Sequence, residues 1–233
     1  MALLPAMLRT NVEGTANLAA ACGGVRSFVY TGTCEEYGDQ EAPFREDSRE
    51  RPVSPYSLSK AMASHLCLML HRTRAFPAVV ARPFLTYGPR QEGGMFIPAL
   101  LRACLEGRDF EMTPGEQTRE FNFVGDIVEG FIRAAATPQA IGRTVNLGSG
   151  RQITIEDLAQ MIAKLLDRPL AIHQDAQRLR PASSEVERLV ADPTVARTVL
   201  GWEPSTSLED GLTRTIEWIK DHLDGYRPHA YSI

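Results

Sequence analysis

Two short apolar segments, residues 27–31 and 78–81, stand on either side of a long helical pattern, and this alternation limits the possible folds more than any other feature of the sequence. The first, SFVYT, is β-branched and aromatic and runs into a polar stretch, as a strand does when it enters a loop. The second, AVVA, has no polar residue at alternate positions, which is typical of a buried parallel strand. Ser54 and Pro55 begin the intervening helix, which extends to about Arg74. This alternation of helix and strand predicts an α/β fold.

The remaining predicted elements fall into two groups. A helix over residues 8–21 precedes the first strand and ends at Gly23 and Gly24. After Gly88 and Pro89 the pattern becomes less regular, which indicates a smaller lobe built off the sheet. The helices predicted in this later part are 96–106, 126–136, 154–166 and 207–222, and the strands are 110–112, 120–123, 144–147 and 170–173.

Composition excludes several classes of protein. The 233 residues carry 25 basic and 29 acidic side chains, a net charge of −4, without a basic cluster, so binding to nucleic acid phosphates is not expected. No apolar run approaches the ~18 residues of a membrane-spanning helix, and no signal peptide is recognisable, so we expect a cytoplasmic protein without membrane association. The 4 cysteines form no C-x-x-C pair and the 5 histidines show no ligand spacing, so we expect no metal.

The most informative polar pair lies on the predicted helix after Ser54. Tyr56 and Lys60 are four residues apart, so both side chains project from one face of the helix, one turn from each other. An ammonium held near a phenol favours the phenolate and lowers its pKa from ~10, which turns a poor base into a usable one. Many surface helices carry such a pair, so the surrounding sequence has to decide its meaning.

Two loops frame this pair. Thr31-Gly32-Thr33-Cys34-Glu35-Glu36-Tyr37-Gly38 follows the first strand, and residues 82–91, RPFLTYGPRQ, follow the second. Both loops leave the carboxyl ends of predicted parallel strands, which is the edge at which α/β sheets bind ligands. We therefore expect both loops and the Tyr56 helix to meet at one edge of the sheet.

Taken together and in this order, the segments resemble the extended short-chain dehydrogenase/reductases, and within them the NAD-dependent epimerase/dehydratase group that acts on nucleotide sugars. The resemblance covers nearly the whole chain. The segments that carry it are Thr10-Asn11-Val12-Glu13-Gly14-Thr15, the TGTCEEYG loop, SPYSLSK at 54–60, YGPRQ at 87–91, TREF at 118–121 and LGWEP at 200–204.

For catalysis, the resemblance implies that Thr33 hydrogen-bonds the sugar hydroxyl being oxidised and that Tyr56 removes its proton. Lys60 would bind the nicotinamide ribose and lower the pKa of Tyr56. A hydride would pass to NAD, or to NADP, and the resulting 4-keto sugar would have an acidic neighbouring C–H group. The cofactor-binding residues that the resemblance implies are Thr10, Asn11, Tyr56, Lys60, Pro83 and Phe84.

Three positions bear on the type of reaction. Glu35 matches the glutamate of family dehydratases that abstracts the acidic carbon-bound proton, although a related carboxylate occurs in nucleotide-sugar decarboxylases and Glu35 could equally be a solvated loop residue. Cys34 stands where some dehydratases carry an acidic residue, which argues against a glucose-type dehydratase mechanism. Leu85 replaces an asparagine common in the substrate loop, so a usual sugar contact is missing.

Substrate binding is assigned to arginines. By resemblance, Arg119 matches the arginine that grips the nucleotide diphosphate, and Arg180, before Pro181, resembles a second one; Arg90 in the YGPRQ turn is a further candidate. A guanidinium suits phosphate oxygens because it donates two parallel hydrogen bonds. Each could instead be an ordinary surface arginine.

One departure concerns the cofactor. The family begins with a strand and a G-x-x-G-x-x-G turn that holds the cofactor pyrophosphate, and no segment of this sequence matches that turn. We therefore expect a partial Rossmann-type parallel sheet, with the first βαβαβ part absent, and a smaller C-terminal α/β substrate lobe. Residues 1–92 with 124–149 are assigned to the cofactor domain, and residues 93–123 and 150–233 to the lobe. The 233-residue chain is expected not to bind NAD measurably.

The function expected from this resemblance is NAD-dependent epimerisation or dehydration of a nucleotide-diphospho-sugar through a transient 4-keto intermediate, by a homodimer. The helices over residues 8–21 and 55–74 match those of the family's four-helix dimer contact, and their apolar positions permit it. Two alternatives remain open. A nucleotide-sugar 4-ketoreductase would use Thr33, Tyr56 and Lys60 but leave Glu35 idle, and the chain could also be a non-catalytic remnant.

Overall fold

A three-stranded parallel sheet forms the centre of the computed structural model, which describes residues 3–112, 115–168, 172–174 and 188–226. Its strands β1 (Phe28–Thr31), β2 (Ala78–Pro83) and β7 (Thr144–Leu147) lie in the order β1-β2-β7. Val29 lies opposite Val79, and Ala81 lies opposite Val145. Every residue of β2 before Pro83 is buried, because helices cover both faces of the sheet. The predicted α/β fold with a parallel sheet is confirmed.

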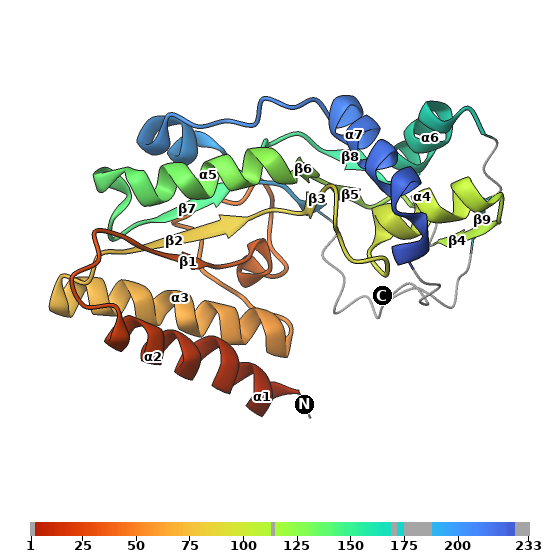
Figure 1. Ribbon diagram of the computed structural model, residues 1–233. Helices are drawn as coiled ribbons and strands as arrows, with labels where there is room; N and C mark the ends of the chain where they lie inside the picture. Colours follow the sequence, from red (N-terminus) through yellow and green to blue (C-terminus); the bar gives the residue numbers. More distant parts are fainter. Residues whose placement is uncertain (1–2, 113–114, 169–171, 175–187, 227–233) are drawn as a thin grey trace.

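The helices and the sheet form three layers, with the sheet in the middle (Figure 1). On one face lie α1 (Leu4–Leu8), the π-helical turn η1 (Arg9–Glu13), α2 (Gly14–Ala21) and the long α3 (Pro55–Arg74). On the other face lies α5 (Val124–Ala136), whose Ile127 and Ala134 pack with Val79 and Val145. Tyr30, Ala63 and Val80 form the core on the α3 side.

Helices α4 (Phe96–Glu106), α6 (Ile155–Leu166) and α7 (Leu208–Asp221) and the short strands near them form a second group at the carboxyl ends of the strands (Figure 1). The three helices bury one aliphatic cluster that includes Leu100, Leu158 and Leu212. The remaining strands form small sheets. Strand β3 (Thr86–Tyr87) pairs with β6 (Asn122–Phe123), and β4 (Phe110–Met112) pairs with β9 (Ile172–Gln174). Strand β5 (Thr118–Arg119) pairs with both β8 (Ile153–Thr154) and β10 (Arg188–Leu189). The short helices are η2 (Cys34–Tyr37), η3 (Pro138–Ala140), η6 (Ala196–Leu200) and η7 (Leu223–Gly225).

The structure moves several predicted boundaries. The first helix begins at Leu4 rather than at residue 8. This start was not predicted, because the N-cap residue, Leu3, has no side chain that could cap the helix. Residues 120–123 do not form one strand; β5 ends before Glu120, whose buried carboxylate accepts hydrogen bonds from the Ala191 and Ser149 amides. Another difference is the helix predicted from residue 126, which begins at Val124.

Among the described residues, no helix combines the length and the apolar character needed to cross a membrane.

Candidate functional site

The loop after β1 is held in a tight polar turn. Thr33 is the N-cap of η2, where its side chain accepts a hydrogen bond from the Glu35 amide at 3.3 Å. In return the Glu36 carboxylate accepts the Thr33 amide at 2.9 Å, which completes a capping box. Only 8% of Thr33 is exposed. The turn therefore fixes the threonine at the carboxyl end of β1, as the sequence predicted for the sheet edge.

Tyr56 and Lys60 come from the first turns of α3. Ser54 and Ser57 cap this helix reciprocally, at 3.0 Å in each direction, so the backbone that carries Tyr56 is well defined. Lys60 reaches down to β1, where its Nζ donates to the Thr31 carbonyl at 2.9 Å. The same Nζ lies 6.0 Å from the centre of the Tyr56 ring. Thr33, Tyr56 and Lys60 therefore lie together.

The electrostatics of this pair differ from the sequence expectation. Burial raises the pKa of Tyr56 above its ordinary value, and the Thr33 side chain opposes this change by hydrogen bonding to the phenol. The charges of Glu35 and Glu36 also raise the pKa of Tyr56, and the Lys60 ammonium donates to the Thr31 carbonyl. Burial lowers the pKa of Lys60, and the negative charge of Glu36 acts in the opposite direction.

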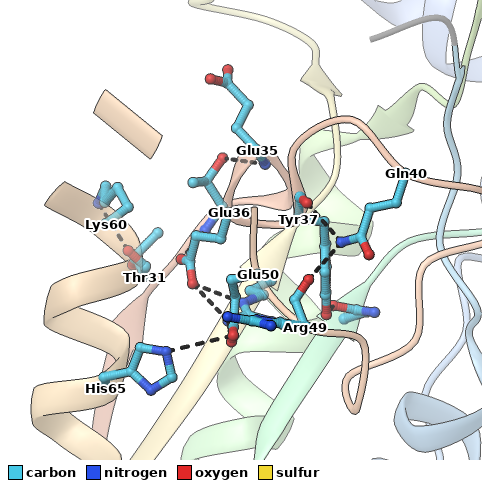
Figure 2. Close-up of polar contacts among 12 residues, drawn as sticks. Thr31, Glu35, Glu36, Tyr37, Gln40, Arg49, Glu50, Lys60 and His65 are labelled. Carbon is cyan, nitrogen blue, oxygen red and sulfur yellow. Dashed lines mark hydrogen bonds and ion pairs between the residues drawn. The ribbon is translucent and has the colours of Figure 1, made fainter. Parts of the chain in front are cut away.

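Two consecutive glutamates in the loop have different surroundings. Glu35 is exposed, and Figure 2 shows its carboxylate pointing away from the polar cluster beneath the loop. Glu36 is fully buried and turns into that cluster. Only Glu35 is therefore placed to meet a bound molecule, which agrees with the role that the resemblance implies for it.

Arg82 is the centre of the buried cluster. Its Nε donates to Glu36 Oε2 at 2.9 Å and its Nη2 to Glu50 Oε1 at 2.7 Å. The guanidinium also lies 4.6 Å above the centre of the Tyr37 ring. His65, at the surface of α3, is 3.5 Å from Glu50 (Figure 2). The contact between Glu36 and Arg82 was not predicted, because the two residues are 46 positions apart and no local sequence pattern connects them.

A second polar connection joins η1 to α3. Asn11 Nδ2 donates to Ser59 Oγ at 2.8 Å, and Ser59 Oγ donates to the Tyr56 carbonyl at 2.8 Å. Asn11 was expected at the cofactor, and its amide nitrogen is instead directed at α3. Ser59 was not predicted as a site residue at all. The Tyr56 backbone is thereby anchored to the helix before β1.

The other expected cofactor residues occupy different environments. Thr10 is exposed on η1, and Pro83 is the half-buried last residue of β2. The Phe84 side chain is 1% exposed and packs in a cluster with Tyr37, Phe44 and Leu189. Phe84 therefore supports the loop from below.

The three expected phosphate-binding arginines are spread over the second group of elements. Arg119, on β5, is half-buried and donates from Nη1 to the Thr118 carbonyl at 2.9 Å. Arg90 is exposed in the turn after β3, with a positive φ of 68°. Arg180 lies outside the described residues. Strand β10 pairs with β5 and ends one residue before Val190, whose carbonyl accepts the Phe44 amide at 2.8 Å. The Arg119 strand is therefore tied to the loop that follows Thr33.

The loop after β1 also contains a buried thiol, that of Cys34. Burial raises the pKa of Cys34 to about 12, so this thiol remains protonated near neutral pH and is not a nucleophile. In the part of the chain that the structure describes, no three His, Cys, Asp or Glu residues are grouped so that they could hold a metal ion.

Comparison with known proteins identifies the relatives of this chain. Residues 5–148 match the model of the NAD dependent epimerase/dehydratase family. A dTDP-glucose 4,6-dehydratase from Streptomyces griseus is 34% identical over 225 residues, which cover 95% of this chain and 67% of the relative.

Solved structures give the same result. UDP-glucuronic acid 4-epimerase from Bacillus cereus, in complex with UDP-glucuronic acid and NAD, superposes with a TM-score of 0.84 at 30% identity and covers 92% of this chain and 68% of its own. The protein RMD from Pseudomonas aeruginosa, complexed with NADPH, has a TM-score of 0.84 at 26% identity, with 92% of this chain and 74% of its own covered.

Proposed function

Because the chain belongs to the NAD dependent epimerase/dehydratase family, we propose that it carries the catalytic residues of an enzyme that epimerises or dehydrates a nucleotide-diphospho-sugar through a transient 4-keto intermediate. Its relatives include a dTDP-glucose 4,6-dehydratase and a UDP-glucuronic acid 4-epimerase. The observation that carries the proposal is the meeting of Thr33, Tyr56 and Lys60 at the carboxyl edge of the sheet.

The residues present fit the nicotinamide end of NAD. Tyr56 is 36% exposed beside Lys60, so both side chains are accessible from the edge of the sheet where ligands bind in α/β folds. When bound, the cofactor supplies the hydride acceptor for the oxidation. The pyrophosphate of a dinucleotide is typically held by glycine-rich backbone amides at a helix N-terminus, and no residue is assigned to that end of the cofactor here.

In this proposal each side chain has a separate task. The Thr33 hydroxyl orients the sugar hydroxyl, and the Tyr56 phenolate accepts its proton as the C–H bond is broken. Lys60 stabilises the phenolate once its ammonium leaves the Thr31 carbonyl for the neighbourhood of the phenol. The Glu35 carboxylate, exposed beside Thr33, accepts the proton of the carbon that the new keto group acidifies. Arg119, Arg90 and Arg180 are proposed to hold the diphosphate.

A nucleotide-sugar 4-ketoreductase is the second candidate. It would use the same Thr33, Tyr56 and Lys60 and release the oxidised cofactor, and NADPH in the related RMD structure favours it. The two reactions differ in Glu35, which a simple reductase does not need. A chain that binds sugar nucleotides without turning them over is the third possibility.

The protein is proposed to act as a homodimer through α2 and α3. Four large apolar side chains on these helices are exposed in the single chain: Leu18, Leu58, Met62 and Met69. The three residues of α3 recur at intervals of four and seven, so they form one stripe along the helix. Such a stripe is typical of helices that pack against a partner.

Substitution of Tyr56 tests the proposed function. In a chain completed with an N-terminal glycine-rich segment, Tyr56→Phe should lower conversion of a UDP-sugar by about 10²–10⁴-fold and leave UDP binding unchanged in isothermal titration. Arg119→Ala should do the reverse and weaken UDP binding first. Arg108→Ala, which removes an arginine from a surface pair with Glu106, is the control and should leave both quantities unchanged. Equal loss of UDP binding in the Tyr56 and Arg119 variants would contradict the assignment.

A further inference from the structure

A carboxylate that the proposed chemistry does not use, that of Glu36, lies buried directly behind Thr33. One of its oxygens accepts the Thr33 amide at 2.9 Å, and the other accepts Arg82 Nε at 2.9 Å. Glu36 and Arg82 are 0% and 1% exposed. Buried carboxylates are rare because desolvation is costly unless every oxygen is paired. Glu36 therefore connects the catalytic loop to β2 through a fixed charge.

The neighbouring glycine leaves space for this carboxylate. A Cβ atom built on Gly32 would lie 2.6 Å from Glu36 Oε1 and 3.0 Å from Arg82 Cγ. The positive φ values of the chain do not include Gly32, so its backbone conformation does not require glycine. The missing side chain at residue 32 therefore serves the packing of the Glu36–Arg82 pair.

Lys60 lies next to this cluster, because its Nζ donates to the Thr31 carbonyl and the following residue, Gly32, packs against Glu36 Oε1. Glu36 and Glu50 contribute two negative charges, and Arg82 contributes one positive charge. The Lys60 ammonium is the second cation on which the Glu36 charge acts, and it raises the pKa of Lys60 against the effect of burial. His65 pairs with Glu50 from a side chain that is 59% exposed, at the opposite end of the cluster.

The other titratable groups near Glu36 do not compete for this role. They are Tyr37 on η2, Tyr30 on β1, and Tyr56 and Cys67 on α3. Burial raises the pKa of Tyr37 to about 12 and that of Cys67 to about 11, and it raises the pKa values of Tyr30 and Tyr56 as well. Burial thus favours the neutral form of each of these groups, and Arg82 and Lys60 are the cations on which the Glu36 charge acts.

We propose that Glu36 is a positioning residue for the Tyr56–Lys60 pair: it fixes Thr33 through the backbone amide, and its carboxylate is the counter-charge of the Lys60 ammonium. This inference rests on the proposed function, because it assigns to Glu36 the support of residues that act there. Arg82 holds the Glu36 side chain in place, and Glu50 pairs with Arg82 from the other side of the guanidinium. The loop thus uses its two consecutive glutamates differently, with Glu35 facing a bound molecule and Glu36 setting the charge beneath it.

The lysine content of the chain permits a direct test. Lysine occurs only at positions 60, 164 and 220, so ¹³C-dimethylated lysines give few NMR signals, and the signal missing from Lys60→Arg identifies Lys60. In Glu36→Gln the titration midpoint of Lys60 should fall by about one pH unit, because an opposing charge is removed from a partly buried site. Glu35→Gln is the matched control, since it makes the same chemical change one residue away, on an exposed side chain. It should leave the Lys60 midpoint unchanged.

A second variant keeps the test decisive if Glu36→Gln does not fold. Glu36→Asp retains the charge but is one methylene shorter, so it withdraws from the Thr33 amide. Hydrogen exchange of that amide should become about tenfold faster, while amides of β2 keep their protection. The proposal is overturned if Lys60 titrates alike in Glu36→Gln and wild type, if Glu35→Gln shifts it equally, or if Thr33 exchange is unchanged in Glu36→Asp.

Neither measurement needs a cofactor or a sugar. Failure of the titration and exchange results would therefore remove the role of Glu36 and leave the proposed enzymatic activity standing. Conversely, a completed chain that showed no activity while Lys60 shifted as expected would contradict the proposed function alone.

Discussion

The cluster of helices α4, α6 and α7, called the lobe here, and the loop after β1 are held by opposite kinds of contact. In the lobe, α4, α6 and α7 bury aliphatic side chains such as Leu100, Leu158 and Leu212, which contact one another without requiring specific partners. Beneath the loop, Glu36 and Arg82 are as deeply buried, yet each depends on the other. An apolar core loses stability in proportion to the volume removed. Replacing either member of a buried charge pair strongly lowers the free energy of unfolding, because the remaining charge is buried without a partner.

The largest effect is expected at Arg82. Arg82→Met leaves Glu36 buried without its partner and should lower the free energy of unfolding by about 3–5 kcal/mol, as measured by urea denaturation. The double variant Arg82→Met with Glu36→Gln should recover a large part of that loss, since no buried charge is left unpaired. If the double variant is less stable than the single one, the buried pair is not the cause.

Truncation in the lobe should be nearly as costly but should stay local. Leu158→Ala removes a fully buried side chain and should lower the free energy of unfolding by about 2–5 kcal/mol through the lost contacts and the remaining cavity. The Lys60 titration midpoint should not change, because Leu158 belongs to the lobe cluster. A shift of that midpoint would show that the two regions are coupled and would remove the contrast between them.

A smaller effect is expected at Gly32. Gly32→Ala places a Cβ against Glu36 Oε1 and should cost about 1–3 kcal/mol by overpacking. In a Glu36→Ala background the same substitution should cost much less, because the atom that it meets is gone. Additive losses in the double-mutant cycle would contradict the close packing of Gly32 against Glu36.

The smallest effect concerns acid. Burial alone would raise the pKa of Glu50, but the hydrogen bond with Arg82 and the charges of Arg82 and His65 together leave the pKa below the ordinary value. A carboxylate with a depressed pKa in the folded state stabilises the protein above its unfolded pKa of ~4.3, and this contribution is lost as the pH falls through the folded pKa. Glu50→Gln should therefore reduce the difference in urea midpoint between pH 7 and pH 3. Asp47→Asn, in the exposed pair with Arg45, is the control and should change that difference less.

The sequence was informative wherever neighbouring residues determine the structure. The run AVVA predicted the buried strand β2, Ser54 and Pro55 predicted the start of α3, and the Tyr56–Lys60 spacing predicted a shared helix face. The buried cluster could not be predicted in this way. Glu36 and Arg82 read as ordinary charged residues, and only the tertiary fold brings them together and removes both from water. The contact between Asn11 and Ser59, 48 residues apart, escaped prediction for the same reason.

Strand β1 pairs with β2 on one side, and no strand of the described residues pairs with its other side. The Phe28 and Gly32 amides donate to Pro77 and Ala81, so the alternation of a parallel ladder directs the Val29 and Thr31 amides outward. A strand that adds there in parallel would end beside Thr33, at the point where the strand order of a doubly wound sheet reverses and its ligand crevice opens. Pairing of a strand with the free edge of β1 would then complete the sheet and form that crevice at the same time. The affinity for the ligand would therefore depend on how stably that strand pairs with β1.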